Sequence, residues 1–198
     1  RSSRNIEFAF YGDFLSAFPF ASSQALRMLM SFIGLAEEVA DAFVRAGYTG
    51  AVMASSLFAL RPLPGVERPP VGTLLPTAGE LCLLLDAGAN IGCKPRHLLQ
   101  FAHLGTTYMR DVMDRLSPRV GLLNIGEEPG KGDELSVATF ELLRGDQGLN
   151  FIGNIEGRDI IGGGCDVIVC DGFVGNILLK FYESVAGYIV NLLKGELA

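Results

Sequence analysis

Short, nearly uninterrupted apolar runs alternate along this chain with longer stretches in which apolar residues recur at helical spacing. Continuous runs are typical of strands buried on both faces of a parallel sheet, and a 3.6-residue period indicates amphipathic helices. The alternation of the two predicts an α/β fold with a doubly wound, mostly parallel sheet. The expected strands are 6–11, 73–75, 81–85, 120–125, 151–155 and 167–170. The expected helices are 35–44, 51–60, 95–113, 134–144 and 176–193.

The last expected helix carries an apolar stripe that continues to the end of the chain. Its positions follow helical spacing, and an ordinary core helix is the favoured interpretation over a helix that lies on a membrane. We expect residues 1–198 to form a single α/β domain. Because the apolar stripe continues to the end of the chain, we expect this domain to be an incomplete part of a longer natural protein. The stripe consists of Phe181, Val185, Ile189, Leu192 and Leu193.

Composition and charge narrow the function classes. The chain has 198 residues, 49% of them hydrophobic, and 16 Lys+Arg against 22 Asp+Glu give a net charge of −6. This apolar share excludes a disordered chain, and an acidic chain without a concentrated basic footprint argues against a nucleic-acid partner. The mean hydropathy of +0.34 is high for an acidic globular protein. The excess apolar surface must therefore lie in a core, in a subunit interface or against a membrane.

Four cysteines bear on metal binding and on the cellular compartment. Cys82, Cys93, Cys165 and Cys170 lack the paired spacing of a zinc site and are too sparse for a disulfide-stapled fold. We expect them to be reduced, structural and placed in strands of a cytoplasmic protein. The two histidines lie six residues apart on one expected helix, on different faces, so no metal site is expected.

Polar side chains follow four of the expected strands. Ligands of open α/β sheets bind beyond the carboxyl ends of the strands, and small, amide and Lys residues suit an anion held near helix N-termini. The alternatives stay open: Gly and Asn are common in turns, Asp can cap a helix, and both lysines can be solvated surface residues. These positions are Asp86, Gly88, Asn90 and Lys94; Asn124; Asn154; and Asp171, Gly175, Asn176 and Lys180.

Two glycine-rich segments do not indicate a nucleotide site. Residues 126–132 resemble a phosphate-binding P-loop, but only three residues separate the glycines and Gly132 stands where Ser or Thr would hold Mg²⁺. The segment around Gly88 and Gly92 lacks the G-x-G-x-x-G spacing of a dinucleotide site.

Several motifs together resemble one family. They include Leu83-Leu84-Leu85-Asp86-Ala87-Gly88-Ala89-Asn90, Lys94-Pro95, the segment 118–126, Asn150-Phe151-Ile152-Gly153-Asn154 and Asp171-Gly172-Phe173-Val174-Gly175-Asn176. In this order, with 46–51 and 74–77, they resemble the phosphate acyltransferase (PlsX) family of bacterial phospholipid synthesis. Gly175-Asn176-x-x-x-Lys180 is also similar to an element of phosphotransacetylases, which implies an isocitrate/isopropylmalate dehydrogenase-like architecture.

The resemblance implies transfer of a long-chain acyl group from acyl carrier protein to inorganic phosphate, which gives an acyl phosphate. It implies no cofactor and no metal. The implied partners are the carrier protein, a membrane glycerol-3-phosphate acyltransferase and a second copy in a homodimer. The implied location of the protein is the cytoplasm, with peripheral membrane association. The implied catalytic residues are Lys180, Asn176, Asp171 and Asp86. The implied substrate- and phosphate-binding residues are Gly47, Thr49, Gly50, Gly88, Asn90, Lys94, Asn124, Asn154 and Gly175.

The sequence also departs from the family pattern. No Asp-x-Met-Gly-Gly-Asp turn is present, and Tyr48 stands where the family has Asn. Two other hypotheses therefore stay open: a phosphotransacetylase-like acyltransferase that uses coenzyme A thioesters, and a non-catalytic docking scaffold for acyl carrier protein.

Overall fold

A computed structural model describes residues 49–196 of the chain, which divides into two compact units, Arg1–Val66 and Glu67–Ala198. The described part of the first unit contains one helix, α3 (Thr49–Leu60), which matches the expected helix 51–60. The expected strand 6–11 and helix 35–44 lie outside the described residues. The single domain over residues 1–198 stays a prediction.

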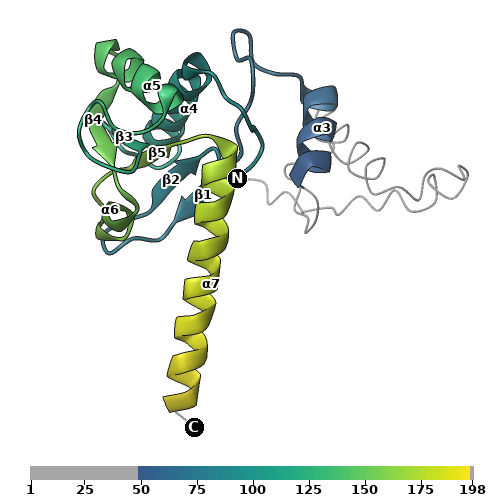
Figure 1. Ribbon diagram of the computed structural model, residues 1–198. Helices are drawn as coiled ribbons and strands as arrows, with labels where there is room; N and C mark the ends of the chain where they lie inside the picture. Colours follow the sequence, from purple (N-terminus) through teal and green to yellow (C-terminus); the bar gives the residue numbers. More distant parts are fainter. Residues whose placement is uncertain (1–48, 197–198) are drawn as a thin grey trace, which may run out of the picture. The chain divides into compact units, whose positions relative to one another are not determined.

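The second unit is built on a five-stranded sheet with the order β1-β2-β5-β3-β4 (Figure 1). Strands β2, β5, β3 and β4 are parallel, and β1 joins the edge antiparallel to β2. The predicted α/β fold with a mostly parallel sheet is confirmed. The strands are β1 (Gly72–Leu75), β2 (Cys82–Leu85), β3 (Arg119–Leu123), β4 (Asn150–Ile155) and β5 (Val167–Val169).

Helices cover both faces of this sheet. On one face, side chains of α4 (Pro95–Asp111) and α5 (Glu134–Gly145) pack against alternate strand residues such as Leu83 and Leu85. On the other face, Leu84 and its neighbours pack against α6 (Gly157–Gly162) and the first half of α7 (Gly172–Glu196). Because consecutive strand residues enter two different cores, β2 is apolar at every position.

Two helices differ from expectation. Helix α6 was not predicted, because six residues are too few to show a helical period. The Glu156 amide donates to Asp159 Oδ2 at 2.8 Å at the start of this helix. Helix α7 begins at Gly172, four residues before the expected start, because Asp171 caps it there and overrides the low helix propensity of Gly172 and Gly175.

The interpretation of α7 as an ordinary core helix is wrong for most of its length. Leu178, Leu179 and Tyr182 pack against the core, and the Tyr182 hydroxyl donates to the carbonyl oxygen of Pro76. Four of the five residues of the predicted stripe are open: Phe181 is 67% exposed, Leu193 is 56% exposed, and Ile189 and Leu192 are about half exposed, while Val185 is half-buried. Within residues 49–196, no helix is both long enough and apolar enough to cross a membrane.

All four cysteines are free, as predicted. Cys82 lies in β2, and Cys165 and Cys170 flank β5, all three buried. Hydrogen bonding to Cys165 and burial raise the pKa of the Cys82 thiol, and burial raises that of Cys170. The expectation of strand positions is confirmed for Cys82 alone: Cys165 and Cys170 lie just outside β5, and Cys93 lies in the loop before α4 and is half-buried.

Candidate functional site

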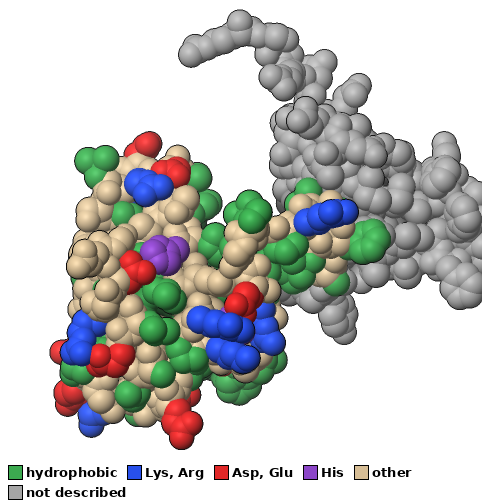
Figure 2. Space-filling view, turned by 90° about the horizontal axis from the view of Figure 1, so that it is seen from above, with side chains coloured by type: hydrophobic (Ala, Val, Ile, Leu, Met, Phe, Trp, Pro, Cys, Tyr) green, Lys and Arg blue, Asp and Glu red, His purple; other side chains and the backbone are tan. Residues whose placement is uncertain are grey.

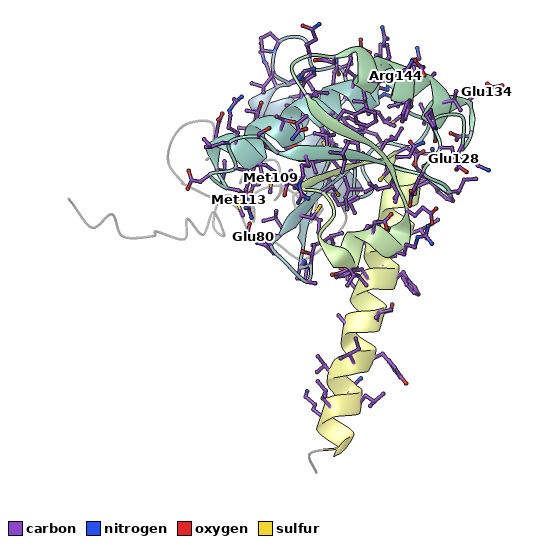
Figure 3. The ribbon with its side chains drawn as sticks, turned by 90° about the vertical axis from the view of Figure 1, so that its left-hand side faces the viewer. Glu80, Met109, Met113, Glu128, Glu134 and Arg144 are labelled. Carbon is purple, nitrogen blue, oxygen red and sulfur yellow. The ribbon has the colours of Figure 1, made fainter. Side chains whose placement is uncertain are left out.

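The carboxyl ends of the four parallel strands meet at one edge of the sheet. Figure 3 separates the two edges, since Glu128, in the loop after β3, lies on one side and Glu80, in the turn before β2, lies on the other. The topology brings the polar residues that follow the strands to the first of these edges. They are Asp86 and Asn90 after β2, Asp171 after β5, Asn124 after β3, and Asn154 near the end of β4.

The Asp86 carboxylate organises the loop after β2. Its side chain is fully buried, and Oδ1 accepts hydrogen bonds from the amides of Val71, Gly88 and Ala89, each at 3.0 Å. Oδ2 accepts from the Asn90 amide at 2.7 Å and from Asn90 Nδ2 at 2.8 Å. Five donors compensate the desolvation of one carboxylate, so Asp86 holds the loop in place and does not cap a helix.

The same loop is fastened to the start of α7. The Gly172 amide donates to the Asn90 carbonyl oxygen at 2.8 Å, and a Cβ at Gly172 would lie 2.7 Å from that oxygen. A Cβ at Gly175 would collide with the carbonyl oxygen of Asp86. The two glycines therefore let the first turn of α7 approach the backbone of the loop closely.

This close approach brings Asn176 against Gly88. A Cβ at Gly88 would lie 3.2 Å from the Asn176 Cβ, and Gly88 has φ +135°, a conformation that favours glycine. Lys180 follows Asn176 by four residues, so both side chains lie on the same face of α7. Both are exposed, and neither side chain has a hydrogen-bond or ion-pair partner among the described residues.

Asp171 is the N-cap of α7. Its Oδ1 accepts from the Val174 amide at 2.9 Å, and its carbonyl oxygen accepts from the Gly175 amide at 2.9 Å. Of the two interpretations left open for Asp171, the structure thus shows the helix cap. The Gly175 amide is occupied by this bond, so the packing of Gly175 is its main structural contribution.

The loop continues from Asn90 into α4. The Lys94 amide donates to His97 Nδ1 at 3.0 Å, and the Lys94 side chain is exposed. Cys93 Sγ lies 3.6 Å from the Asn90 carbonyl oxygen. Burial, together with the charges of Asp171 and Asp86, raises the pKa of the Cys93 thiol to about 11. Cys93 therefore stays a neutral thiol at neutral pH, next to the candidate site.

A second polar group lies at the ends of β3 and β4. Asn124 Nδ2 donates to the Lys131 carbonyl oxygen at 2.9 Å, and Asn154 Nδ2 donates to the Glu128 carbonyl oxygen at 2.8 Å. The two asparagines thus hold the loop that resembles a P-loop. Asn154 is 93% buried, and its Oδ1 has no hydrogen-bond partner among the described residues.

The structure places the predicted residues in separate groups. Asp86, Gly88, Asn90, Asp171, Gly175 and Asn176 come together through printed contacts, with Lys94 and Lys180 adjoining them in the chain. Asn124 and Asn154 form the second group. Thr49 and Gly50 begin α3 in the first unit, and Gly47 lies outside the described residues.

Sequence reasoning missed the segment that completes the Asp86 network. Pro69 accepts from Asn90 Nδ2 at 2.9 Å through its carbonyl oxygen, and the Val71 amide reaches Asp86. These bonds join a side chain to a backbone group 21 and 15 residues away, and no side-chain pattern marks Pro69 or Val71. Among residues 49–196, no group of three or more His, Cys, Asp or Glu side chains could hold a metal ion.

The fold, a mostly parallel sheet with helices on both faces, has solved counterparts among phosphotransacetylase-type proteins. It is similar to a EutD phosphotransacetylase from Staphylococcus aureus, with a TM-score of 0.60 and 16% identity over 88% of this chain and 63% of that one. A branched-chain phosphotransacylase from Enterococcus faecalis V583 gives a TM-score of 0.52 and 16% identity over 80% and 64%.

The chain belongs to the fatty acid synthesis protein family, whose model matches residues 19–198. It is 55% identical over 162 residues to the phosphate acyltransferase of Nostoc sp., covering 81% of this chain and 48% of that protein. It is 55% identical over 161 residues to the phosphate acyltransferase of Desulforamulus reducens, with 81% and 48% covered. The chain thus spans about half the length of these relatives.

Proposed function

We propose that the intact protein is a phosphate acyltransferase, which transfers a long-chain acyl group from acyl carrier protein to inorganic phosphate. The observation that carries the proposal is the contact of Gly88 with Asn176 on the first turn of α7, four residues before the unpaired Lys180. Relatives named phosphate acyltransferases match 81% of this chain at 55% identity, which supports the same activity here.

The reaction needs little proton transfer. A phosphate oxygen attacks the thioester carbonyl carbon, the carbonyl oxygen becomes an oxyanion, and the carbon–sulfur bond breaks as a thiolate leaves. Phosphate is already an anion at neutral pH, so catalysis rests on positioning the reactants and stabilising the oxyanion. This step requires no cofactor and no metal.

Asn176 and Lys180 are the proposed groups that bind phosphate or the oxyanion. Side chains of a helix point toward its N-terminus, so Lys180 is directed back over the turn that holds Asn176. A Lys ammonium then supplies a point charge, and the Asn amide supplies a hydrogen bond of fixed direction. Both donors are unpaired among the described residues, so both are available to an anion.

The other residues have positioning or binding roles in this proposal. Asp86 and Asp171 hold the loop and the helix start that carry the donors. Lys94 and Asn124 are proposed as further anion contacts. Asn90, whose Nδ2 already donates to Pro69 and Asp86, and Asn154, whose Oδ1 has no hydrogen-bond partner among the described residues, are proposed as further binding residues. The proposal also includes Gly88 and Gly175 at the close contact. Substrate binding by Gly47, Thr49 and Gly50, which the family resemblance implies, stays a prediction.

The open apolar side chains of α7 support two further parts of the proposal. Tyr188 is 66% exposed, and its neighbours Ile189 and Val190 are about half exposed. Apolar surface of this extent is typical of a protein–protein or membrane contact. We therefore propose a homodimer with peripheral membrane association, which passes its acyl phosphate to a membrane glycerol-3-phosphate acyltransferase.

The test uses the intact protein with acyl carrier protein thioester and phosphate, and traps acyl phosphate as the hydroxamate with hydroxylamine. We expect product from the wild type and a loss of about 100-fold or more in kcat/KM for Lys180→Ala, since one electrostatic donor is removed. Lys194→Ala, an exposed Lys in the last turn of α7, is the matched control and should retain activity.

Three other results would change the conclusion. Product from coenzyme A thioesters alone would make the protein a phosphotransacetylase-like enzyme. Binding of carrier protein without any turnover would make it a docking scaffold. Full activity of Lys180→Ala would refute the assignment of this side chain while leaving the activity intact.

A further inference from the structure

A group of cations borders the candidate site. Lys94 and Arg96 open α4, and Arg68 Nη1 donates to the Ile91 carbonyl oxygen at 3.3 Å on the loop that leads from Asn90 to Lys94. Ile91 itself is 71% exposed. We call Arg68, Ile91, Lys94 and Arg96 the basic patch. The face in Figure 2 shows Lys and Arg side chains gathered beside an acidic side chain and next to hydrophobic ones.

The charge of the basic patch stands out against the rest of the chain. The chain carries −6, yet no Asp or Glu occurs between residues 87 and 110, where Lys94, Arg96 and Arg110 lie. Glu67 is the one acidic side chain with a contact to the basic patch among the described residues, at 2.8 Å from Arg96. The buried His97 also contacts Glu67, with Nε2 3.1 Å from Oε2. Glu67 is thus paired with Arg96 and His97, and the positive charges of Arg68 and Lys94 have no carboxylate partner among the described residues.

Lys94 and Arg96 also occupy an unfavourable position for a cation. They lie at the N-terminus of a 17-residue helix that has no acidic residue in its first turn. The helix dipole disfavours positive charge there. An anionic partner on this surface would offset that cost.

The basic patch is connected to the reacting groups by a short path. The carbonyl oxygen of Asn90 accepts from the Gly172 amide, and Ile91 is the next residue in the chain. A partner bound on the basic patch would therefore lie next to the loop that carries Asn90. This placement suits a donor whose reactive group is carried on a long flexible arm.

We infer that the basic patch is the docking surface for the acidic acyl carrier protein that delivers the thioester; this inference rests on the proposed function. The cations pair with carboxylates of the carrier protein, and Ile91 contributes an apolar contact at the centre of the interface. Such charge complementarity mainly sets the association rate and the choice of partner. The donor is then selected by a surface outside the reaction site.

The test reverses two charges in the intact protein, with Arg68→Glu and Arg96→Glu combined, and leaves Lys94 unchanged because it is also a proposed anion contact. We expect KM for the carrier-protein thioester to rise about tenfold, with weakened salt dependence. The kcat and KM for a small acyl-pantetheine thioester should stay at the wild-type values, which also shows that the site is folded. Arg110→Glu with Arg144→Glu, an identical charge change at the far ends of α4 and α5, is the control.

Direct binding of carrier protein, measured by fluorescence anisotropy, separates the two proposals. If the wild type binds carrier protein and the double variant does not, while neither forms acyl phosphate, the docking surface stands and the proposed function fails. Equal KM and equal binding for wild type and variant overturn the docking surface, whatever the activity. Loss of binding to vesicles of anionic lipid, with carrier-protein binding unchanged, assigns the basic patch to a membrane and overturns the inference as well.

Discussion

Gly175, in the first turn of α7, packs directly on the backbone of Asp86, so that a Cβ at residue 175 would collide with the Asp86 carbonyl oxygen. The Asp86 side chain meanwhile holds its own loop through five hydrogen bonds. Asp86 thus holds the loop through its carboxylate, and the first turn of α7 packs against its carbonyl group. The separation of loop and helix, and with it the Gly88–Asn176 contact, depends on both.

Replacing Gly175 with Ala should move α7 away from the loop. The atom that obstructs the new Cβ belongs to the backbone, which cannot rotate aside, so we expect a loss of about 1–3 kcal/mol in the free energy of unfolding. Activity should fall more than stability suggests, because Asn176 moves with the helix. Urea denaturation and acyl phosphate formation measure the two effects.

Gly187→Ala is the matched control on the same helix. A Cβ there meets no atom within 4 Å, so the change should be neutral or stabilising by up to about 1 kcal/mol through helix propensity. If the two variants were equally stable and equally active, the close contact of Gly175 would have no role in the site.

Asp86→Asn keeps the shape of the side chain and removes half of its acceptors. An amide NH₂ would then face N–H donors in a fully buried place, since donors approach both carboxylate oxygens. We expect a loss of about 2–4 kcal/mol in the free energy of unfolding, because unpaired buried groups add to the lost bonds. Asp111→Asn removes a solvent-exposed partner of Arg110 and should cost clearly less stability than Asp86→Asn. Similar losses in the two variants would contradict the role of Asp86.

The core strands could be predicted from the sequence within about two residues at each end, because β2, β5 and β3 enter the two apolar cores on both faces. The antiparallel direction of β1 could not, since pairing of Gly72 with Leu85 is a property of the hairpin and not of the four residues. Helix α6 has six residues, too few to show a helical period.

The candidate site shows the same division. The positions of Asp86 and Asp171 follow from the rule that ligands meet the carboxyl ends of parallel strands. What Asp86 binds does not follow, because its partners Val71 and Asn90 come from segments on opposite sides of β2 in the chain. The unpaired Oδ1 of Asn154 likewise depends on how the loop around Glu128 closes over it.

Asp166 and Arg119 join the amino ends of β5 and β3, away from the candidate site. The Asp166 carboxylate accepts from the Arg119 amide at 2.7 Å and from its guanidinium at 3.1 Å. Burial acts to raise the pKa of Asp166, but the hydrogen bonds from Arg119 outweigh it and the pKa is lowered. Asp166→Asn should therefore reduce the free energy of unfolding by about 1–2 kcal/mol at neutral pH.

The pH dependence of this loss has a defined sign. A lowered pKa in the folded state stabilises the protein above the unfolded-state pKa of Asp, about 3.9, and this stabilisation disappears as the pH falls. The difference between wild type and Asp166→Asn should be constant from pH 8 to about 5 and shrink below about pH 4. Thermal denaturation across this range measures it, and a difference that grows in acid would contradict the pair.

Cys93 reports on the charges beside the candidate site. Its thiol has a pKa of about 11, raised by burial and then by the charges of Asp171 and Asp86, and lowered by Arg68. Only about one thiol in a thousand is ionised at pH 8, so alkylation by iodoacetamide should be slow and rise nearly tenfold per pH unit up to about pH 10. Asp171→Asn keeps an effective helix cap and removes one negative charge, so the pKa of Cys93 should fall and alkylation at pH 8 should accelerate. Arg68→Gln should act in the opposite direction and slow it. Mass spectrometry of the peptide that contains Cys93 gives the rates, and changes of the same sign in both variants would show that these charges do not control the thiol.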